Sequence, residues 1–241
     1  MRNIKLVIEY DGTDFLGWQI QAEGRTVQGE ITTVLEQVLQ EPINLIGAGR
    51  TDSGVHARGQ VANFRTNSVM RAGAIQSALN GLLPADIIVL SSDEVPESFH
   101  SRYDACERVY RYHLSLRPTA VGRQYSWYVR SPLRVAIMQE AASTFVGLHD
   151  FEAMSKSGEL DHHRCDVRKS FWKECVDGLV YEIRSDRFVR GMVRSLVGTM
   201  VDLGRGAMSW EDFRVILDSK DRSRGGMAAP PHGLFLEEVA Y

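Results

Sequence analysis

The sequence predicts an α+β fold built from two βαββαβ halves, each in the ferredoxin-like arrangement. Within residues 1–100, apolar side chains follow the order strand, helix, strand, strand, helix, strand. Residues 101–241 repeat that order with one extra helix. No low-complexity linker separates the two stretches. We therefore expect two halves, residues 1–100 and 101–241, whose strands can join in one extended sheet with a cleft between them.

The first half starts with a strand at residues 4–10, which is apolar enough for the centre of a sheet. Val27, Ile31 and Val34 begin a series of apolar residues at helical spacing, which predicts an amphipathic helix over residues 26–40. The remaining elements of this half are strands at 43–48 and 59–66, a helix at 70–82 and a buried strand at 87–90.

The second half starts with a long alternating strand near residues 107–116. Asp177 and Gly178 are typical turn residues, so they are expected to connect a pair of strands. The other expected elements are helices at 133–146, 188–203 and 209–218, the two strands of that pair at 167–176 and 179–185, and a final strand at 234–240. The duplication rests on this order alone, because the two halves share no sequence repeat.

Composition places the chain among ordinary globular proteins. Its 241 residues are 44% hydrophobic and 24% charged, with a net charge of −3. No window is apolar over the length that a membrane helix needs, and the strand-like start leaves no room for a signal peptide. Three cysteines, an odd number, do not indicate a disulfide framework. We expect a cytoplasmic protein with no membrane partner.

One glycine-rich loop, residues 47–57, places a single carboxylate where a ligand can reach it. Asp52 lies between Thr51 and Ser53 and two residues after Arg50, among glycines that permit turns which other residues resist. A strand follows directly, so the loop is anchored on a rigid element. The neighbouring arginine favours an ionised carboxylate, which can act as a nucleophile or a base. The same residues also fit an ordinary polar turn in which Asp52 bonds its own backbone.

Positive charge and aromatic residues gather in one stretch. Residues 101–134 contain seven arginines and two acidic residues, a balance of +5, whereas residues 1–48 have a balance of −4. Six tyrosines and tryptophans are interleaved with these arginines. Cations for phosphates and flat rings for bases are what a nucleic-acid surface needs. An amphipathic strand pair with a solvated arginine face is the alternative interpretation.

Two further candidates lie in the second half. Arg194 lies one helical turn after Arg190, at the edge of the apolar face of the 188–203 helix, from where its long side chain can reach a cleft. An ordinary surface arginine is the alternative. Tyr110 lies in an alternating strand in which residues 108, 110 and 112 share a face, so its ring can stack on a base or fill the core.

Metal and cofactor motifs are weak or missing. The histidines and cysteines within residues 162–175 lack the second close ligand pair of a zinc site. Gly47 and Gly49 do not form a dinucleotide fingerprint, and the sequence has neither a Walker-type lysine loop nor a nucleophile-elbow serine. We therefore expect no metal and no cofactor.

Taken together, these segments resemble the tRNA pseudouridine synthase A family (TruA type) almost from end to end. The most specific match is the loop Gly49-Arg50-Thr51-Asp52-Ser53-Gly54-Val55-His56-Ala57. The other matching segments are Glu9-Tyr10-Asp11-Gly12-Thr13, Phe15, Gly17-Trp18-Gln19, Arg25-Thr26-Val27-Gln28-Gly29, Ala78-Leu79-Asn80, Leu83-Pro84, Arg102, Cys106-Glu107-Arg108-Val109-Tyr110-Arg111-Tyr112, His149-Asp150-Phe151, Met192-Val193-Arg194 and Gly233-Leu234. Residues 162–169 depart from the family pattern, being more polar and richer in histidine.

The resemblance implies an isomerase with the pseudouridine synthase fold. In that fold two ferredoxin-like halves form one mainly antiparallel sheet, with helices on one side and a central basic cleft. The resemblance further implies a homodimer that binds the anticodon stem-loop of tRNA and converts uridine to pseudouridine without a metal or cofactor. The N1–C1′ bond breaks, the uracil turns, and it is rejoined through C5.

The resemblance also implies roles for individual residues. Asp52 is the essential carboxylate; it attacks C1′ or uracil C6, or acts as a base at C2′, and the sequence does not choose between these. Arg50 helps to extract the target base and fills its place, since chemistry on a stacked base requires flipping it out. Tyr110 stacks on the flipped uracil and assists in removing the C5 proton, and Arg194 pairs with Asp52. Arginines within residues 101–134 contact phosphates.

Three other functions compete with this one. A catalytically inactive tRNA-binding protein could share the fold, although Arg50, Asp52, Tyr110 and Arg194 are all present. A hydrolase with Asp52 as nucleophile would release free uracil. A metal-dependent enzyme would use residues 162–175.

Overall fold

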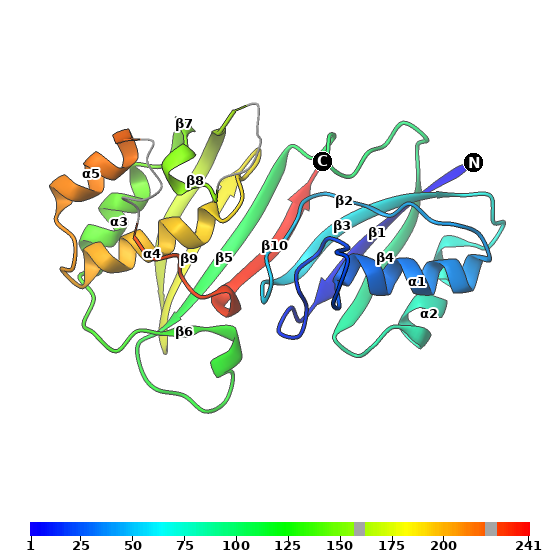
Figure 1. Ribbon diagram of the computed structural model, residues 1–241, viewed down its shortest axis with the longest axis horizontal. Coiled ribbons are helices and arrows are strands. Elements are labelled where there is room, and N and C mark those ends of the chain that lie inside the picture. Colours follow the sequence, from blue (N-terminus) through cyan, green and yellow to red (C-terminus); the bar gives the residue numbers. More distant parts are fainter. Residues whose placement is uncertain (157–161, 220–225) are drawn as a thin grey trace. The chain divides into compact units, whose positions relative to one another are not determined.

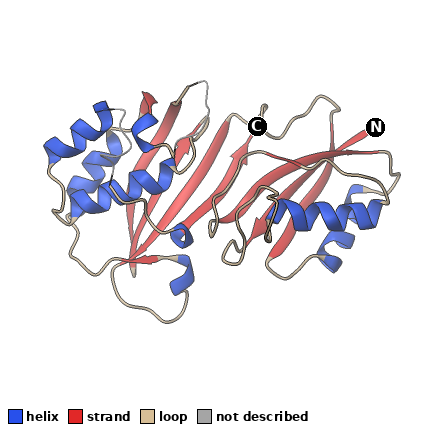
Figure 2. Ribbon diagram, in the orientation of Figure 1, coloured by secondary structure: helices blue, strands red, loops and turns tan. Residues whose placement is uncertain are grey.

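The computed structural model describes residues 1–156, 162–219 and 226–241. These residues form two compact units: unit 1 contains residues 1–106 and 235–241, and unit 2 lies within residues 107–234. Figure 1 labels their helices and strands, and Figure 2 colours the same view by secondary structure. Both units combine antiparallel strand pairs with packed helices, which confirms the predicted α+β class.

Unit 1 begins with the predicted βαββαβ order. Its elements are β1 (Arg2–Tyr10), α1 (Val27–Leu39), β2 (Ile46–Gly47), β3 (His56–Thr66), α2 (Ala72–Leu82) and β4 (Ile87–Val95). Strand β1 pairs antiparallel with both β3 and β4, and β2 pairs antiparallel with β3. Strand β1 therefore lies between two partners, as its apolar sequence predicts.

Local sequence explains where α1 begins and ends. The Thr26 side chain caps the helix by accepting a hydrogen bond from the Gly29 amide (3.3 Å), and Glu30 places a negative charge in the first turn. Gln40 ends the helix in the left-handed conformation. The predicted apolar face is buried, and α1 packs against α2, which in turn packs on β4.

The C-terminal strand β10 (Leu234–Ala240) lies in unit 1 from its second residue onward, whereas the sequence placed it in the second half. It pairs parallel with the start of β3, opposite His56 and Ala57. This close approach depends on Gly59, because a Cβ there would lie 2.4 Å from the carbonyl oxygen of Glu237. The strand itself was predicted, but its neighbour is set by this tertiary contact.

Unit 2 combines a further set of mainly antiparallel strands with helices. Its elements are β5 (Glu107–Ser115), β6 (Trp127–Tyr128), α3 (Val135–Ser143), β7 (Gly147–Asp150), β8 (Arg164–Cys175), β9 (Gly178–Ser185), α4 (Met192–Gly204) and α5 (Trp210–Ser219). The antiparallel order is β5-β9-β8-β7, and β6 pairs parallel with β5. Trp172 of β8 donates from Nε1 to the sulfur of Met200 in α4 (3.2 Å), so α4 covers the face of the sheet that carries Trp172.

The expected strand at 43–48 is shorter in the structure, because side chains satisfy part of its backbone. The Gln28 amide group donates to the Leu45 carbonyl (2.8 Å), and the Glu36 carboxylate accepts from the Ile43 amide (3.1 Å). Of the expected 43–48 strand, only Ile46 and Gly47 (β2) pair with β3. Side-chain partners of this kind compete with ladder hydrogen bonds and shorten a strand.

Unit 2 also differs from its predicted elements in detail. Helix α4 begins at Met192 rather than at residue 188, because Gly191 has a φ of 75° and ends the preceding loop. Arg190 therefore precedes the helix, and the prediction that it lies one helical turn before Arg194 was wrong. Val176 and Asp177 make the turn between β8 and β9, since Gly178 already pairs with Cys175. Strands β6 and β7 were not predicted because two and four residues show too little periodicity.

Candidate active site

The Asp52 loop, residues 48–55, connects β2 to β3 in unit 1. Arg50 is exposed, Thr51 is buried and Asp52 is half-buried. The Thr51 hydroxyl and the Tyr10 hydroxyl share a hydrogen bond of 2.8 Å, and the Thr51 carbonyl accepts from the Trp18 amide (3.1 Å). The residue before Asp52 is therefore fixed by groups from the end of β1 and from the segment that follows it.

Phe15 fixes the residues after Asp52. Its carbonyl oxygen accepts from the Gly54 amide (3.3 Å) and from the Ser53 hydroxyl (3.2 Å). The Val55 amide donates to the Asp52 carbonyl (3.2 Å), and Gly54 has a φ of 75°. The loop is thus a turn, as the plainer interpretation held, but a second segment of the chain holds that turn on both sides of Asp52.

Two glycines let the second segment, residues 11–19, come this close. Gly17 has a φ of 98°, and a Cβ there would lie 2.6 Å from the Thr51 carbonyl oxygen and 3.1 Å from the Asp52 carbonyl carbon. At Gly12 a Cβ would lie 2.0 Å from the Val55 carbonyl oxygen. A side chain at either position would push the two segments apart.

Arg25 supports Phe15. Its guanidinium carbon lies 4.2 Å from the centroid of the buried Phe15 ring. Asp86 accepts two hydrogen bonds from this guanidinium (2.6 and 2.9 Å), and Glu30 accepts a third (2.8 Å). The hydrogen bonds to Asp86 raise the pKa of Arg25 above its ordinary value, with a further contribution from Glu30. A charged, multiply bonded arginine thus braces the residue that holds Ser53 and Gly54.

His56, the first residue of β3, joins the Asp52 loop to residues 11 and 12. The imidazole is buried and stacks on Phe235 of β10 (ring centroids 4.6 Å apart, 22° between planes). Its Nδ1 lies 3.0 Å from the Gly12 amide and 3.0 Å from Oδ1 of Asp11. Nδ1 accepts from Gly12 in one tautomer and donates to Asp11 in the other, so either form ties the turn after β1 to the start of β3.

In unit 2, β5 carries Tyr110 and Tyr112 with different surroundings. Tyr110 is half-buried, and its ring lies edge-on to Phe188 (centroids 5.0 Å apart, 83° between planes). Tyr112 is fully buried, and its hydroxyl donates to the Pro230 carbonyl (2.8 Å). Burial raises the pKa of Tyr112, and the positive charge of Arg194 opposes that shift. Of the two rings, Tyr110 is the one that a ligand can reach.

Arg194 lies in the first turn of α4, where the positive end of the helix dipole disfavours a cation. The side chain is half-buried, and its Nε donates to the Ala229 carbonyl (2.7 Å). The Ala229 amide in turn donates to the Arg194 carbonyl (2.9 Å). The Pro230 carbonyl also accepts from Tyr112 of β5. Residues 229 and 230 therefore bond both to Arg194 of α4 and to Tyr112 of β5.

The four predicted residues divide between the units. Arg50 and Asp52 lie in one loop of unit 1, and Tyr110 and Arg194 lie in unit 2, each described within its own unit. No role in holding the Asp52 loop was predicted from the sequence for the residues that shape it: Tyr10, Phe15, Gly17, Trp18 and Arg25. The only signal was the glycines and aromatic residues without a regular period between residues 10 and 18.

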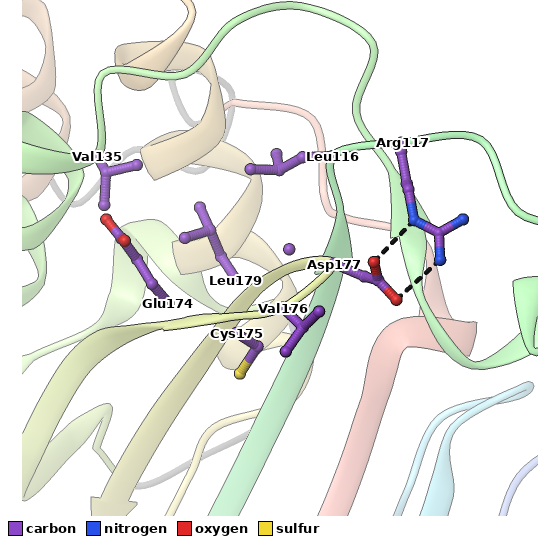
Figure 3. A pocket seen from close by; sticks show the side chains of 9 residues that line it. Leu116, Arg117, Val135, Glu174, Cys175, Val176, Asp177 and Leu179 are labelled. Carbon is purple, nitrogen blue, oxygen red and sulfur yellow. Dashed lines mark hydrogen bonds and ion pairs between the residues drawn. The ribbon is translucent and has the colours of Figure 1, made fainter.

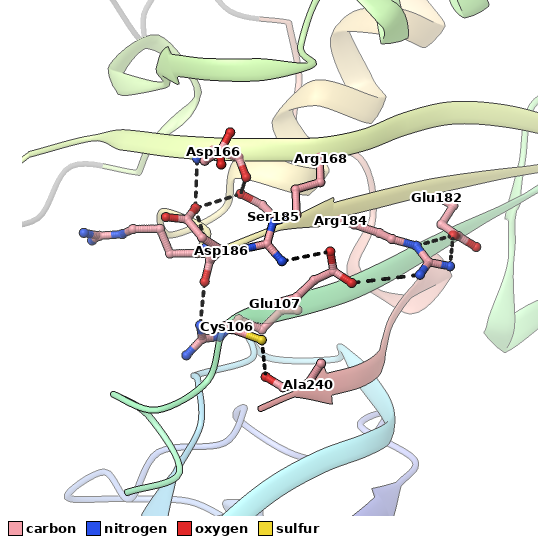
Figure 4. Close-up of polar contacts among 11 residues, drawn as sticks. Cys106, Glu107, Asp166, Arg168, Glu182, Arg184, Ser185, Asp186 and Ala240 are labelled. Carbon is pink, nitrogen blue, oxygen red and sulfur yellow. Dashed lines mark hydrogen bonds and ion pairs between the residues drawn. The ribbon is translucent and has the colours of Figure 1, made fainter.

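Ion pairs link β5 to the neighbouring strands, and Figure 4 shows the pairs that Glu107 and Glu182 make with Arg168 and Arg184. Arg111 pairs with Glu182 of β9 (2.8 Å), and Glu182 also pairs with Arg184 (2.7 Å). Glu107 pairs with Arg168 of β8 (3.4 Å). Burial alone would raise the pKa of Glu182, but the hydrogen bonds from Arg184 and Arg111 outweigh it and hold the pKa below its usual value. This network neutralises part of the predicted basic surface.

A hollow of about 340 Å³ lies elsewhere in unit 2, around the turn between β8 and β9 (Figure 3). Its lining includes Leu116, Val135 and Leu179, with Arg117 and Asp177 bonded to each other at one side. None of the four predicted residues lines it. The hollow is therefore a separate feature from the candidate site.

Within the described residues, one set of potential metal ligands comes together: Asp150, Glu152 and His163, whose ligand atoms lie within 4.8 Å of one another. The set includes neither cysteine of residues 162–175. Exposed acidic groups often come together in this way without an ion. Of the helices in the described part of the chain, none has the length and apolar character needed to cross a bilayer.

Comparison with known proteins gives one consistent result. A family model described as tRNA pseudouridine synthase matches residues 6–104 and 141–241. The tRNA pseudouridine synthase A of Chlorobium limicola is 44% identical over 243 residues, and that of Pelodictyon phaeoclathratiforme is 45% identical over 243 residues. The tRNA pseudouridine synthase A 2 of Clostridium perfringens is 40% identical over 244 residues. Each of these alignments covers 100% of this chain and 100% of the relative.

Proposed function

Because the chain belongs to the tRNA pseudouridine synthase family, a family of isomerases, we propose that it converts uridine to pseudouridine in the anticodon stem-loop of tRNA. The observation that carries the proposal is the Asp52 loop itself. Its carboxylate is half-buried, and the backbone on both sides is fixed by Tyr10, Trp18 and Phe15. A reactive group held in one place before the substrate arrives is what catalysis by positioning requires.

The proposed reaction needs no second reactant. The N1–C1′ bond breaks, a C5–C1′ bond forms, the C5 proton leaves, and N1 gains a proton, so atoms and electrons balance within the nucleotide. Asp52 starts this sequence by adding to C1′ or uracil C6, or by removing the C2′ proton. These three routes predict different intermediates and share the same requirement for the carboxylate.

The other predicted residues take roles that suit their local surroundings. Arg50 is exposed on the loop, and we assign it to extract the target base and fill the space that the flipped base leaves. Tyr110 stacks on the flipped uracil with the part of its ring that Phe188 leaves open, and assists removal of the C5 proton. We assign Arg194 to pair with Asp52. The family model covers Arg50, Asp52 and Arg194, and Tyr110 lies within the full-length alignments with the relatives.

Binding of tRNA is proposed to use the arginines that carboxylates do not hold. Arg123 and Arg130 are exposed and have no carboxylate partner among the ion pairs of the described residues. Phosphate contacts release counterions, so tRNA affinity should fall steeply with added salt. We further propose a homodimer, which sedimentation of the purified chain tests directly.

The test is to incubate the protein with unmodified tRNA, digest the RNA and separate the nucleosides. Pseudouridine formation by the wild type, and none by Asp52→Ala, is the expected result. Free uracil with an abasic site would indicate a hydrolase. Tight tRNA binding with no product from the wild type would indicate an inactive binding protein. Loss of product on chelation would indicate a metal-dependent enzyme.

A further inference from the structure

The connection after β4, residues 96–106, carries an exposed aromatic ring that has no role in the reaction described above. Tyr103 is 75% exposed. Its ring lies against the His100 ring, with centroids 4.3 Å apart and 35° between planes. The guanidinium carbon of Arg102 lies 5.7 Å from the Tyr103 centroid. Leaving this much aromatic surface in water is unfavourable relative to burying it, so the Tyr103 ring would gain free energy by contact with a ligand.

The backbone beneath this ring is firmly anchored in unit 1. Ser101 is completely buried. Its amide donates to Oδ1 of Asn63 (2.9 Å), its hydroxyl donates to the Ile46 carbonyl (2.6 Å), and its carbonyl accepts from the Tyr241 hydroxyl (2.7 Å). Three partners from three different segments therefore hold one loop residue.

His100 orders the residues on the exposed side of that anchor. Its Nδ1 accepts from the amides of Arg102 (3.2 Å) and Tyr103 (3.3 Å). Asp104 closes the loop, because its Oδ2 accepts from the His100 amide (2.9 Å) and its own amide donates to the His100 carbonyl (3.1 Å). The ring of Tyr103 is thus presented on a backbone that is already fixed, which lowers the entropy lost when a ligand stacks on it.

We propose that Tyr103, backed by His100 and flanked by Arg102, is a stacking platform for a nucleobase of the RNA substrate other than the target uridine. An exposed aromatic face with an adjacent guanidinium suits any base, because every base has a flat face and a phosphate beside it. Asn63, which holds Ser101, lies seven residues along β3 from His56, which is about 23 Å at the rise of a strand. The base on Tyr103 is therefore not the one that reaches Asp52.

The inference rests on the proposed function in one respect, namely that the ligand is RNA. A test compares Tyr103→Ala, Tyr103→Leu and Tyr103→Phe with Val69→Ala, a control at a 94% exposed position of the same unit. For each full-length protein one measures the Kd for unmodified tRNA, the rate of pseudouridine formation with all tRNA bound, and the sedimentation coefficient.

Loss of one stacked base is worth about 1–3 kcal/mol, so Tyr103→Ala and Tyr103→Leu should raise the Kd about 5- to 150-fold. Tyr103→Phe keeps the ring and should stay within about twofold of the wild type, as should Val69→Ala. The loss should fall on Kd and KM rather than on the rate of the bound complex. Circular dichroism and melting curves confirm that each variant is folded.

Wild-type affinity in Tyr103→Ala would overturn the platform, and so would a leucine that serves as well as a phenylalanine. A change in sedimentation in Tyr103→Ala would also overturn it, because the ring would then belong to a protein interface. If the wild type forms no pseudouridine while Tyr103→Ala still weakens tRNA binding, the proposed function fails and the platform stands. If the wild type is active and Tyr103→Ala binds tRNA as tightly, the platform fails and the proposed function stands.

Discussion

Asp52 and Asp177 are both aspartates in glycine-containing turns, yet the structure holds them in different ways. Asp177 lies at the exposed tip of the β8–β9 hairpin, and its two oxygens accept from the Arg117 guanidinium (2.8 and 2.8 Å). Those hydrogen bonds hold the pKa of Asp177 below its ordinary value. At Asp52 the backbone is what is held, by Tyr10 and Trp18 before it and by Phe15 after it.

The Asp177 carboxylate itself bonds Arg117 and so helps to close its turn. The turn around Asp52 is held at the neighbouring residues and presents the Asp52 side chain. Asp177 stabilises its hairpin through a side-chain pair in water, where such pairs are weak. The Asp52 loop is held by contacts to Thr51, Ser53 and Gly54, on either side of Asp52. A loop built in this way fixes the position from which the Asp52 side chain is presented.

The largest expected effect comes from replacing each aspartate by asparagine. Asp52→Asn should lower the single-turnover rate of pseudouridine formation by at least about 1,000-fold, because it removes the carboxylate that we propose reacts. Asp177→Asn should leave that rate within about twofold of the wild type, since it removes only an exposed ion pair. Comparable rates for Asp52→Asn and Asp177→Asn would contradict the claim that only Asp52 takes part in the reaction.

Gly17→Ala tests whether the close approach of residues 11–19 fixes the loop. A Cβ at a φ of 98° and 2.6 Å from the Thr51 carbonyl oxygen should cost about 2–4 kcal/mol and slow the bound reaction. Gly73→Ala is the matched control, because a Cβ at Gly73 in α2 meets nothing within 4 Å. It should be neutral or stabilising by up to about 1 kcal/mol. Urea titration measures the free energy of unfolding of Gly17→Ala and of Gly73→Ala. Equal changes in the two variants would contradict the claim that Gly17 is needed for the close approach.

Tyr10→Phe removes the hydroxyl that holds Thr51 and should lower stability by about 1 kcal/mol. The rate of the bound complex should fall as well, because Thr51 precedes Asp52. Tyr181→Phe, which loses a buried hydrogen bond of 2.8 Å to Ser170 in unit 2, should lose similar stability without slowing the reaction. Loss of rate in both variants or in neither would show that the Tyr10 contact does not act on the loop.

Acid should weaken unit 2 through Glu182. Its folded-state pKa is depressed by Arg184 and Arg111, so the ionised carboxylate stabilises the fold above the unfolded pKa of glutamate. That stability is lost as pH falls through the lower folded pKa. Denaturation measured from pH 7 downward should therefore show a shallower decline below about pH 4.3 in Glu182→Gln than in the wild type. Parallel declines would mean that the Glu182 network adds nothing.

The smallest effect belongs to Arg117→Gln at the hairpin tip. Both partners of the Arg117–Asp177 pair are more than half exposed, so the melting temperature should change little and the change should vanish in high salt. A salt-independent loss would show that this turn is held as firmly as the Asp52 loop.

The order of elements was predictable from the sequence because strand and helix periods are local signals. Val27, Ile31 and Val34 repeat at helical spacing and are buried as expected in α1. The partner of β10 was not predictable, because its pairing with β3 depends on the space left by Gly59. Gly191, with a φ of 75°, delays the start of the predicted 188–203 helix to Met192, and the sequence pattern did not show this break.

The candidate site shows the same division. The motif around Asp52 was visible in the sequence, and its glycines correctly indicated a turn. The contacts that fix it join residues about 40 positions apart, such as Tyr10 with Thr51 and Phe15 with Ser53. No local period records such pairs, and only the glycines at positions 12 and 17 hinted at a close approach.

Release of tritium from tRNA labelled at uracil C5 tests the central claim most directly, because pseudouridine forms only when C5 loses its hydrogen. The wild type should release one tritium for each pseudouridine formed, and Asp52→Asn should release none while keeping its fold and its tRNA affinity. Tritium release by Asp52→Asn at the wild-type rate would contradict the claim that the carboxylate presented by this loop carries the reaction.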